Sequence, residues 1–166
     1  MTKVKLATDH GDIILRLDAE KAPRTVENFV RYVEDGYYDG TVFHRVIKNL
    51  VLQGGGFEPG MNIKTTRDAI VNEANNGLGN NAYTVAMARM TEPHSAASQF
   101  FINVNDNDSF NHTDQTEQGW GYAVFGEVIE GREVVDAIEN VRTVTKAGYA
   151  DVPEVDVVLE RAEIVG

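Results

Sequence analysis

Apolar and polar side chains alternate at both ends of the chain, which is the pattern of half-buried β-strands. Lys3–Thr8 and Asp12–Leu17 carry Val, Leu or Ile at every second position, and Asp9–Gly11 between them is a hairpin turn sequence. Val155–Val165 alternates in the same way. We expect strands in all three segments. We also expect the first and last strands to pair, because that pairing removes two free sheet edges.

Two other segments repeat their apolar residues with the period of an α-helix. Pro23–Glu34 has apolar side chains at positions i, i+3, i+4 and i+7, counted from Val26. Proline is favoured at the first helical position, and Gly36 follows as a stop signal. Gly131–Val141 has similar spacing and predicts a second, shorter helix. Each apolar stripe predicts a helix face that packs on a core.

The middle of the chain consists of apolar runs separated by long polar stretches. Further strands are predicted at 43–57, 83–89, 98–104 and 122–128. Loops are predicted at 58–81, 105–119 and 143–153. Loops of this length within a small domain usually carry function. Many short strands with only two helices predict a mostly-β fold, a barrel or a sandwich, and we favour a closed barrel.

Composition narrows the class of protein. The 166 residues suit a single domain, residues 1–166, whose core needs no disulfide or metal. Lys+Arg 15 against Asp+Glu 26 gives a net charge of -11, which disfavours nucleic acid and anionic membranes as partners. Because there is no cysteine, disulfides, thiol catalysis and cysteine-bound metals are excluded. No apolar run has the length of a signal-peptide core or a membrane span. We therefore expect a cytoplasmic monomer.

One stretch combines apolar strand sequence with polar chemistry. Arg45 lies between Phe43 and Val46, and Gln53 follows three aliphatic residues and precedes three glycines. On alternating strands, a planar guanidinium with five donors and an amide would face one concavity. The glycines permit a sharp turn or a close approach of the backbone to a ligand. The alternative is an ordinary surface arginine, because single polar residues are common in strands.

Five motifs together resemble one family. They are Tyr38-x-x-Thr41-x-Phe43-His44-Arg45-Val46-Ile47, Gln53-Gly54-Gly55, Ala86-Met87-Ala88-Arg89, Ser98-Gln99-Phe100-Phe101-Ile102-Asn103 and Gly119-Trp120-Gly121-Tyr122-Ala123-Val124-Phe125-Gly126. In this combination the chain resembles a cyclophilin of the short, single-domain bacterial kind. The resemblance implies a closed eight-stranded antiparallel β-barrel capped by two α-helices. It also implies peptidyl-prolyl cis-trans isomerisation, which assists protein folding and needs neither a cofactor nor a metal.

The resemblance also implies roles for individual residues. The family's catalytic arginine falls on Arg45, its pocket glutamine on Gln53, and the phenylalanine at the floor of the proline pocket on Phe101. The substrate groove is then expected to be lined by His44, Leu50, Val51, Ala88, Arg89, Gln99, Phe110 and Tyr122. The expected partners are proline-containing peptides and unfolded or flexible protein segments.

These assignments have simpler alternatives. Phe101 also suits the core of a strand, and Gln53 and Gln99 also suit interior amides whose hydrogen bonds are satisfied. His44 is better explained as a structural residue, because rotation about a peptide bond transfers no proton. For the whole chain, one alternative is a non-catalytic barrel that grips proline-containing loops. Another is an unrelated barrel that binds a small anion at Arg45.

The sequence departs from the family pattern at three places. Leu50-Val51 stands where members usually have phenylalanine and a second apolar residue, which leaves the pocket apolar but without one ring face. Ser109 stands where cyclosporin-sensitive members carry tryptophan, so we expect weak cyclosporin binding. Tyr83 stands where bacterial relatives usually have glycine, so we expect an altered loop next to the groove.

Overall fold

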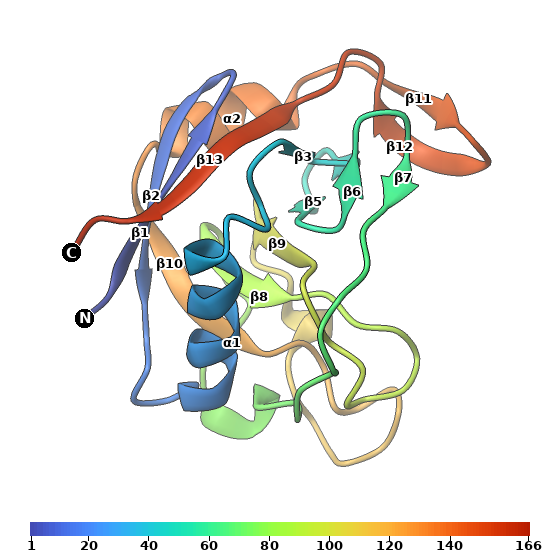
Figure 1. Cartoon of the computed structure of the whole chain (residues 1–166). Helices are drawn as coiled ribbons and strands as arrows, with labels where there is room; N and C mark the ends of the chain where they lie inside the picture. Colours follow the sequence, from blue (N-terminus) through green and yellow to red (C-terminus); the bar gives the residue numbers. More distant parts are fainter.

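The structure is a computed structural model that describes residues 1–166 (Figure 1). Its strands are β1 (Lys3–Thr8), β2 (Gly11–Leu17), β3 (Thr41–Val42), β4 (Arg45–Ile47), β5 (Val51–Gly54), β6 (Phe57–Glu58), β7 (Asn62–Ile63), β8 (Thr84–Met87), β9 (Phe100–Asn103), β10 (Val124–Glu130), β11 (Thr143–Lys146), β12 (Tyr149–Pro153) and β13 (Val158–Ile164). Its helices are α1 (Pro23–Glu34), α2 (Arg132–Glu139) and the single 3₁₀ turns η1 (Ala74–Asn76) and η2 (Asp108–Phe110). None of these helices combines the length and the apolar composition that a membrane span requires.

One curled sheet of 11 strands contains every strand except the β11–β12 hairpin. Its hydrogen-bonded order is β4-β5-β9-β8-β10-β2-β1-β13-β3-β6-β7. The predicted pairing of the first and last strands is confirmed, because β1 pairs with β13 and Val4 lies opposite Ile164. The two chain ends therefore lie side by side (Figure 1). The mostly-β fold with two helices is as expected.

The expected closed eight-stranded barrel is wrong. The sheet forms an open half-barrel, and its end strands β4 and β7 do not pair with each other. The physical reason lies in β3, β6 and β7, which have only two residues each. Strands this short form too few ladder hydrogen bonds to carry the sheet round to β4. The hairpin of β11 and β12 lies next to β4 instead.

That hairpin is a second difference from the prediction, which had a loop at 143–153. Thr143 pairs with Pro153 and Val144 with Val152, and the turn uses Ala147 and Gly148 at positive φ of 50° and 84°. Gly148 tolerates this conformation without strain, which makes the tight turn possible. Neither strand alternates buried and exposed residues along its length, so the sequence pattern did not distinguish the hairpin from a loop.

Helix α1 packs against β13, and helix α2 packs against β2, β4 and β5 (Figure 1). Helix α1 has the predicted bounds, and Val26, Phe29 and Val33 of its apolar stripe are buried. Helix α2 ends at Glu139, two residues before the predicted end. The main core contains 27 buried residues between the helices and one face of the sheet. Phe29 lies at its centre, with ring centroids 5.1 to 5.4 Å from Tyr38, Phe100 and Phe125.

The N-terminus of α1 is capped by a residue far away in the sequence. Ala22 at the N-cap has no side chain that accepts a hydrogen bond. Instead, Glu73 Oε1 accepts hydrogen bonds from the Thr25 backbone N–H and the Thr25 hydroxyl, both at 2.7 Å. A carboxylate at this position also interacts favourably with the helix dipole. The long polar segment 58–81 is thereby attached to the body of the protein.

Candidate active site

A row of side chains crosses one face of the sheet, starting from its β4 edge. The register of β4, β5, β9, β8 and β10 places Arg45, Gln53, Phe101, Ala86 and Val124 successively opposite one another. Directly opposed residues of an antiparallel sheet point to the same face, so these side chains lie in one line. We call this side of the sheet the groove face. The other side, which packs on the main core, is the core face.

The polar end of the row is a chain of hydrogen bonds. Arg45 Nη1 donates to Gln53 Oε1 at 3.2 Å, and Gln53 Nε2 donates to Gln99 Oε1 at 3.0 Å. A Cβ at Gly56 would come within 2.5 Å of the Gln99 side chain, so the glycine makes room for this amide. Arg45 is exposed and makes no other hydrogen bond or ion pair. The glutamines therefore orient the guanidinium and leave most of its donors unpaired.

The apolar end of the row is a pocket of three aromatic rings, Phe101, Phe110 and Tyr122, which we call the aromatic pocket. Phe101 is only 4% exposed and forms the floor. The centroids of Phe110 and Tyr122 lie 5.7 and 5.5 Å from that of Phe101 and 5.1 Å from each other, all edge to face. Leu50, Val51 and Ala88 belong to the same apolar cluster. The cluster can hold a small apolar group close to the Arg45–Gln53 pair.

Two hollows are both lined by Arg89 and Met90, and we call these two residues the ridge. One has a volume of about 400 Å³ and is bordered by the aromatic pocket and the exposed Ser109. The other has a volume of about 220 Å³ and is bordered by Gln99. Next to the ridge, the Ala88 carbonyl and the Arg89 N–H form no hydrogen bond within the protein. An extended peptide can therefore pair with them as an added strand.

The side chain of Arg89 is directed at backbone carbonyls rather than at the groove. Its Nε donates to the Gly121 carbonyl at 2.9 Å, and its Nη2 donates to the Glu117 carbonyl at 3.0 Å. Its Nη1 donates to the carbonyls of Met90 and Thr91 at 2.9 and 3.0 Å. The guanidinium carbon also lies 5.0 Å from the centroid of the pocket ring at position 122. The backbone of Arg89 borders the groove, whereas its charged end binds loops.

His44 is not in contact with the aromatic pocket. The residue is 6% exposed, and its ring lies 4.2 Å from that of Phe57, centroid to centroid. Its Nδ1 is buried without a hydrogen-bond partner. Burial, with a smaller contribution from the positive charge of Arg45, lowers the pKa of His44 to about 4. The imidazole is therefore neutral at physiological pH and has the surroundings of a structural residue.

Sequence reasoning did not identify a buried network of asparagines that supports the pocket walls. Asn103 Nδ2 donates to Asn80 Oδ1 at 3.0 Å, and Asn107 Nδ2 donates to Asn103 Oδ1 at 2.8 Å. Asn80 Nδ2 also donates to the carbonyls of residues 110 and 122, and Asn107 Nδ2 to that of residue 50. Three pocket walls thus depend on one satisfied polar network. The only sequence signal was the polar Asn103 after three apolar residues of a strand.

Tyr83, the third departure from the family pattern, contacts α2 and not the aromatic pocket. Its φ is 67°, a value that favours glycine. The strained conformation is accompanied by a hydrogen bond from the tyrosine hydroxyl to Asp136 Oδ1 at 2.8 Å. The guanidinium of Arg132 lies over the ring at 4.5 Å from its centroid. The altered residue therefore joins β8 to α2 at some distance along the sheet from Arg45.

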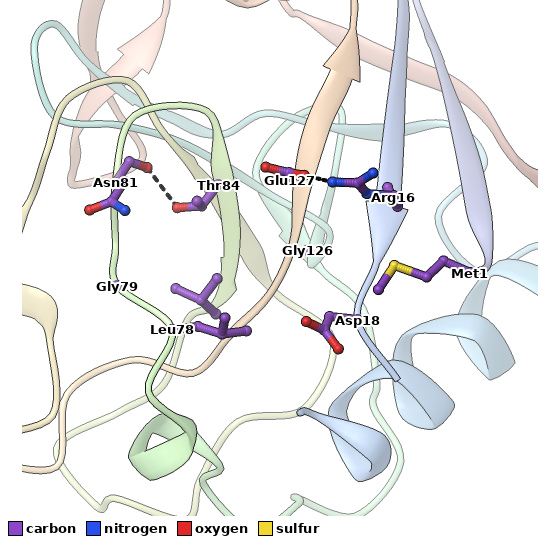
Figure 2. Close-up of a pocket in the computed structure, with 10 residues that line it drawn as sticks. Met1, Arg16, Asp18, Leu78, Gly79, Asn81, Thr84, Gly126 and Glu127 are labelled. Atoms are coloured by element: carbon purple, nitrogen blue, oxygen red, sulfur yellow. Dashed lines mark hydrogen bonds and ion pairs between the residues drawn. The ribbon is translucent and has the colours of Figure 1, made fainter. Parts of the chain in front are cut away.

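A further hollow, of about 230 Å³, lies beyond the row on the groove face, next to Leu78 and Val124 (Figure 2). Its charged side chains are already paired, because Arg16 donates to Glu127 and Asp18 accepts from the Lys21 N–H. No cluster of three or more His, Asp or Glu side chains is close enough to bind a metal ion. The row from Arg45 to Phe101 is therefore the candidate site.

Comparison with known proteins gives consistent results. Residues 3–164 match the sequence model of the family described as cyclophilin type peptidyl-prolyl cis-trans isomerase/CLD. A peptidyl-prolyl cis-trans isomerase of Streptomyces antibioticus is 57% identical over 166 residues, and the alignment covers 100% of this chain and 100% of the relative. Peptidyl-prolyl cis-trans isomerase B of Escherichia coli is 52% identical over 161 residues, which cover 97% of this chain and 98% of the relative.

The fold has solved counterparts as well. The crystal structure of a Cryptosporidium parvum cyclophilin type peptidyl-prolyl cis-trans isomerase, determined in the presence of the dipeptide Ala-Pro, superimposes with a TM-score of 0.84. The sequences are 25% identical, and the match covers 99% of both chains. The open half-barrel is therefore similar to a known cyclophilin over its whole length.

Proposed function

We propose that this chain, which belongs to the cyclophilin type peptidyl-prolyl cis-trans isomerases, rotates the peptide bond before proline at the row of Arg45, Gln53 and Phe101. Membership of this family makes the chain an isomerase of that bond. The observation that carries the site assignment is the register that places the three residues opposite one another on β4, β5 and β9. It brings a cationic donor, an orienting amide and an apolar floor to one place.

The reaction needs little from the enzyme beyond differential binding. Resonance gives the peptide bond a rotational barrier of about 18–20 kcal/mol. The uncatalysed exchange of a bond before proline takes tens to hundreds of seconds. No covalent bond is made or broken, so no nucleophile, base, cofactor or metal takes part. The enzyme accelerates the rotation by binding the twisted state more tightly than either planar state.

Arg45 supplies the interaction that strengthens in the twisted state. Twisting ends the resonance, and the proline nitrogen regains a lone pair that accepts a hydrogen bond. The guanidinium is always charged and donates a charge-assisted bond to that nitrogen. Gln53 and Gln99 hold the guanidinium in orientation through the bonds at 3.2 and 3.0 Å. Little reorganisation is then needed at the moment of rotation.

The aromatic pocket holds the proline ring. Phe101 is its floor, Phe110 and Tyr122 form two walls, and Leu50 and Val51 supply aliphatic sides. The pocket excludes water from the rotating bond, and a hydrogen bond from Arg45 is stronger in such surroundings. The backbone near Ala88 and residue 89 holds the substrate chain in an extended form on one side of the proline. The chain on the other side is then free to rotate.

The substrates are proline-containing peptides and unfolded or flexible segments, because only such chains can enter an open groove and rotate there. The protein acts as a single domain, residues 1–166, and as a monomer, and it assists folding steps that wait for proline. Its acidity disfavours nucleic acid as a partner. Ser109 leaves one wall of the groove without a ring, so cyclosporin binds weakly.

The test is Arg45→Ala, assayed by NMR exchange on a short peptide with one proline. A charge-assisted bond made mainly in the twisted state is worth about 2–4 kcal/mol, so kcat/KM should fall roughly 30- to 1000-fold. Arg45→Lys should recover little of this, because an ammonium lacks the planar fork. Both variants should unfold at the same temperature as the parent, since the side chain is exposed.

The matched control is Arg161→Ala, which removes an exposed arginine of β13 paired with Glu163 outside the groove. It should isomerise at the parental rate. Parental kcat/KM in Arg45→Ala would overturn the site assignment. Retained peptide binding by a parent without any catalysis of exchange would instead favour the alternative of a binding module.

A further inference from the structure

Residues 113–121 form a loop that is largely exposed and that ends at a wall of the aromatic pocket. Most of its hydrogen bonds are internal, such as Thr113 N–H to the Gly119 carbonyl at 2.7 Å and Trp120 N–H to the Thr116 carbonyl at 2.9 Å. Residues 113–118 are all exposed. Tyr122 follows this loop directly, so the loop, together with the Asn80 bond to the Tyr122 carbonyl, positions this pocket wall.

Arg89 holds that loop. Its bond to the Glu117 carbonyl is the one hydrogen bond that joins residues 114–118 to the chain outside 113–121. Its bond to the Gly121 carbonyl, which also accepts from Asn72 Nδ2 at 3.1 Å, helps to fix the residue directly before Tyr122. The same guanidinium lies over the Tyr122 ring. The three nitrogens of the Arg89 guanidinium thus donate four hydrogen bonds. Two go to loop 113–121, and two go to the neighbouring backbone of Met90 and Thr91.

The chemistry of these contacts requires arginine. Only a guanidinium offers five donors in one plane, so it can serve several carbonyls of separate segments while it stacks on a ring. A lysine ammonium in the same place would reach one or two of these carbonyls and has no plane to stack. Because the donors are occupied by backbone, they are not available for substrate side chains. The structural role is thus separate from that of Arg45, whose donors are mostly unpaired.

We propose that Arg89 is a positioning residue, which fastens loop 113–121 to the Met90–Thr91 backbone and so preforms the aromatic pocket and the 400 Å³ hollow beside it. This inference rests on the site assigned under the proposed function and deepens it. Without the arginine, the substrate must order the loop when it binds, and that ordering weakens binding. The chemical step remains with Arg45, so the effect falls on KM rather than on kcat.

The experiment compares Arg89→Ala and Arg89→Lys with the parent in two measurements. Steady-state kinetics on a proline peptide should show KM raised about 10-fold in Arg89→Ala and kcat within about 2-fold. Amide hydrogen exchange without substrate should become faster at residues 113–121, and not in β1 or α1. Arg89→Lys should recover less than half of the change in log KM.

The matched control is Arg67→Ala. Arg67 also fastens a loop, because its guanidinium pairs with Asp35 at the end of α1, but it lies outside both hollows at the ridge. It should leave KM and the exchange of residues 113–121 unchanged. If Arg89→Ala does not fold, Arg89→Gln, which keeps a side chain with two donors, serves for both measurements.

Three results would overturn the proposal. Unchanged exchange at 113–121 would show that Arg89 does not hold the loop. Faster exchange with an unchanged KM would show that the loop does not shape the pocket. Complete recovery by Arg89→Lys would show that charge alone is sufficient. The exchange measurement needs no substrate and is independent of whether Arg45→Ala is active, so failure of this inference and failure of the site assignment are distinguishable.

Discussion

Phe100 and Phe101 are identical neighbours on β9 with opposite surroundings. Phe100 is fully buried on the core face, where its ring lies 5.4 Å from both Phe29 and Tyr38, centroid to centroid. Phe101 lies on the groove face in a cluster of only four buried residues. The ring partners of Phe100 include Phe29 of α1 and Tyr38 in the turn after it, both packed in the main core. Two walls around Phe101 come instead from the 3₁₀ turn that ends at Phe110 and the irregular segment that carries Tyr122.

Under the proposed function, this difference assigns stability to one face of the strand and activity to the other. The core face is held mainly by close packing of 27 buried residues, with few specific hydrogen bonds such as the one from the Tyr38 hydroxyl to the Ser98 carbonyl. The groove face has few apolar neighbours, and its walls are held by directional bonds from Asn80, Asn107 and Arg89. A groove that must stay open to a substrate cannot be stabilised by filling it. Hydrogen bonds to the backbone of the wall residues therefore take the place of side-chain packing within the groove.

The comparison predicts different losses for Phe100→Ala and Phe101→Ala, and this is the largest effect that we expect. Phe100→Ala should lower the free energy of unfolding by about 3–5 kcal/mol, because it leaves a cavity in the main core. Its folded fraction should keep kcat/KM within about threefold. Phe101→Ala should cost less stability, about 2 kcal/mol, but lower kcat/KM at least about 10-fold through loss of the pocket floor.

Urea unfolding and peptide exchange NMR measure the two quantities on the same samples. If Phe100→Ala does not fold, Phe100→Leu and Phe101→Leu test the same contrast with smaller changes. Equal losses of stability and of activity in both variants would show that the two faces are not independent.

A second prediction concerns His44, the buried neighbour of Arg45 in sequence, whose ring packs against that of Phe57. Its pKa is about 4 in the folded protein against 6.5 in the unfolded chain. As the pH falls, His44 therefore takes up a proton in the unfolded chain before it does so in the folded protein. The neutral, buried His44 contributes its full share to the free energy of unfolding above pH 6.5, and this share decreases between pH 6.5 and pH 4. The loss amounts to about 3 kcal/mol. His44→Gln should remove it, as measured by urea unfolding at pH 7 and pH 4.

The exposed turn histidine, His10, supplies the control, and His10→Gln should retain the acid sensitivity of the parent. In the same samples kcat/KM should be constant between about pH 6 and pH 9, because His44 stays neutral over this range and the proposed reaction transfers no proton. A bell-shaped profile of kcat/KM would contradict the assignment of His44 as structural.

The smallest expected effect concerns the rim of the groove face, which can be changed without touching the core face. Ser109→Trp should place a ring over the hollow at Phe110 and strengthen cyclosporin binding roughly 5- to 30-fold, which corresponds to about 1–2 kcal/mol of apolar contact. Isomerase activity on a short peptide should not change, because the proposed function places its proline in the aromatic pocket and not at Ser109. Inhibition titrations of parent and variant measure the difference. Tight inhibition of the parent would show that Phe110 already forms this wall.

Glu160→Trp, on the exposed side of β13, tests whether any added tryptophan has the same effect. It should leave the inhibition curve of the parent unchanged. An equal gain in both variants would mean that cyclosporin binds through nonspecific apolar contact rather than in the groove.

Sequence patterns were sufficient to predict the two helices and the strands at both ends of the chain, and to identify the family. Helix α1 and the pairing partners β1 and β13 follow from periods of 3.6 and 2, which are local properties of the chain. The motifs around Arg45 and Phe101 identified the family, because they occur together in this order. Both kinds of signal are contained in neighbouring residues, so no knowledge of distant contacts was needed.

The tertiary structure alone decided which distant groups meet. It decided that the sheet stays open, because strands of two residues cannot continue the ladder, and that residues 143–153 form a hairpin. It also decided that Glu73 caps α1, that Asn103 supports the pocket walls and that the charge of Arg89 binds loops. The side chains of Glu, Asn and Arg accept many different partners. Which partner each one finds depends on chain segments that are far apart in sequence and are brought together only by folding.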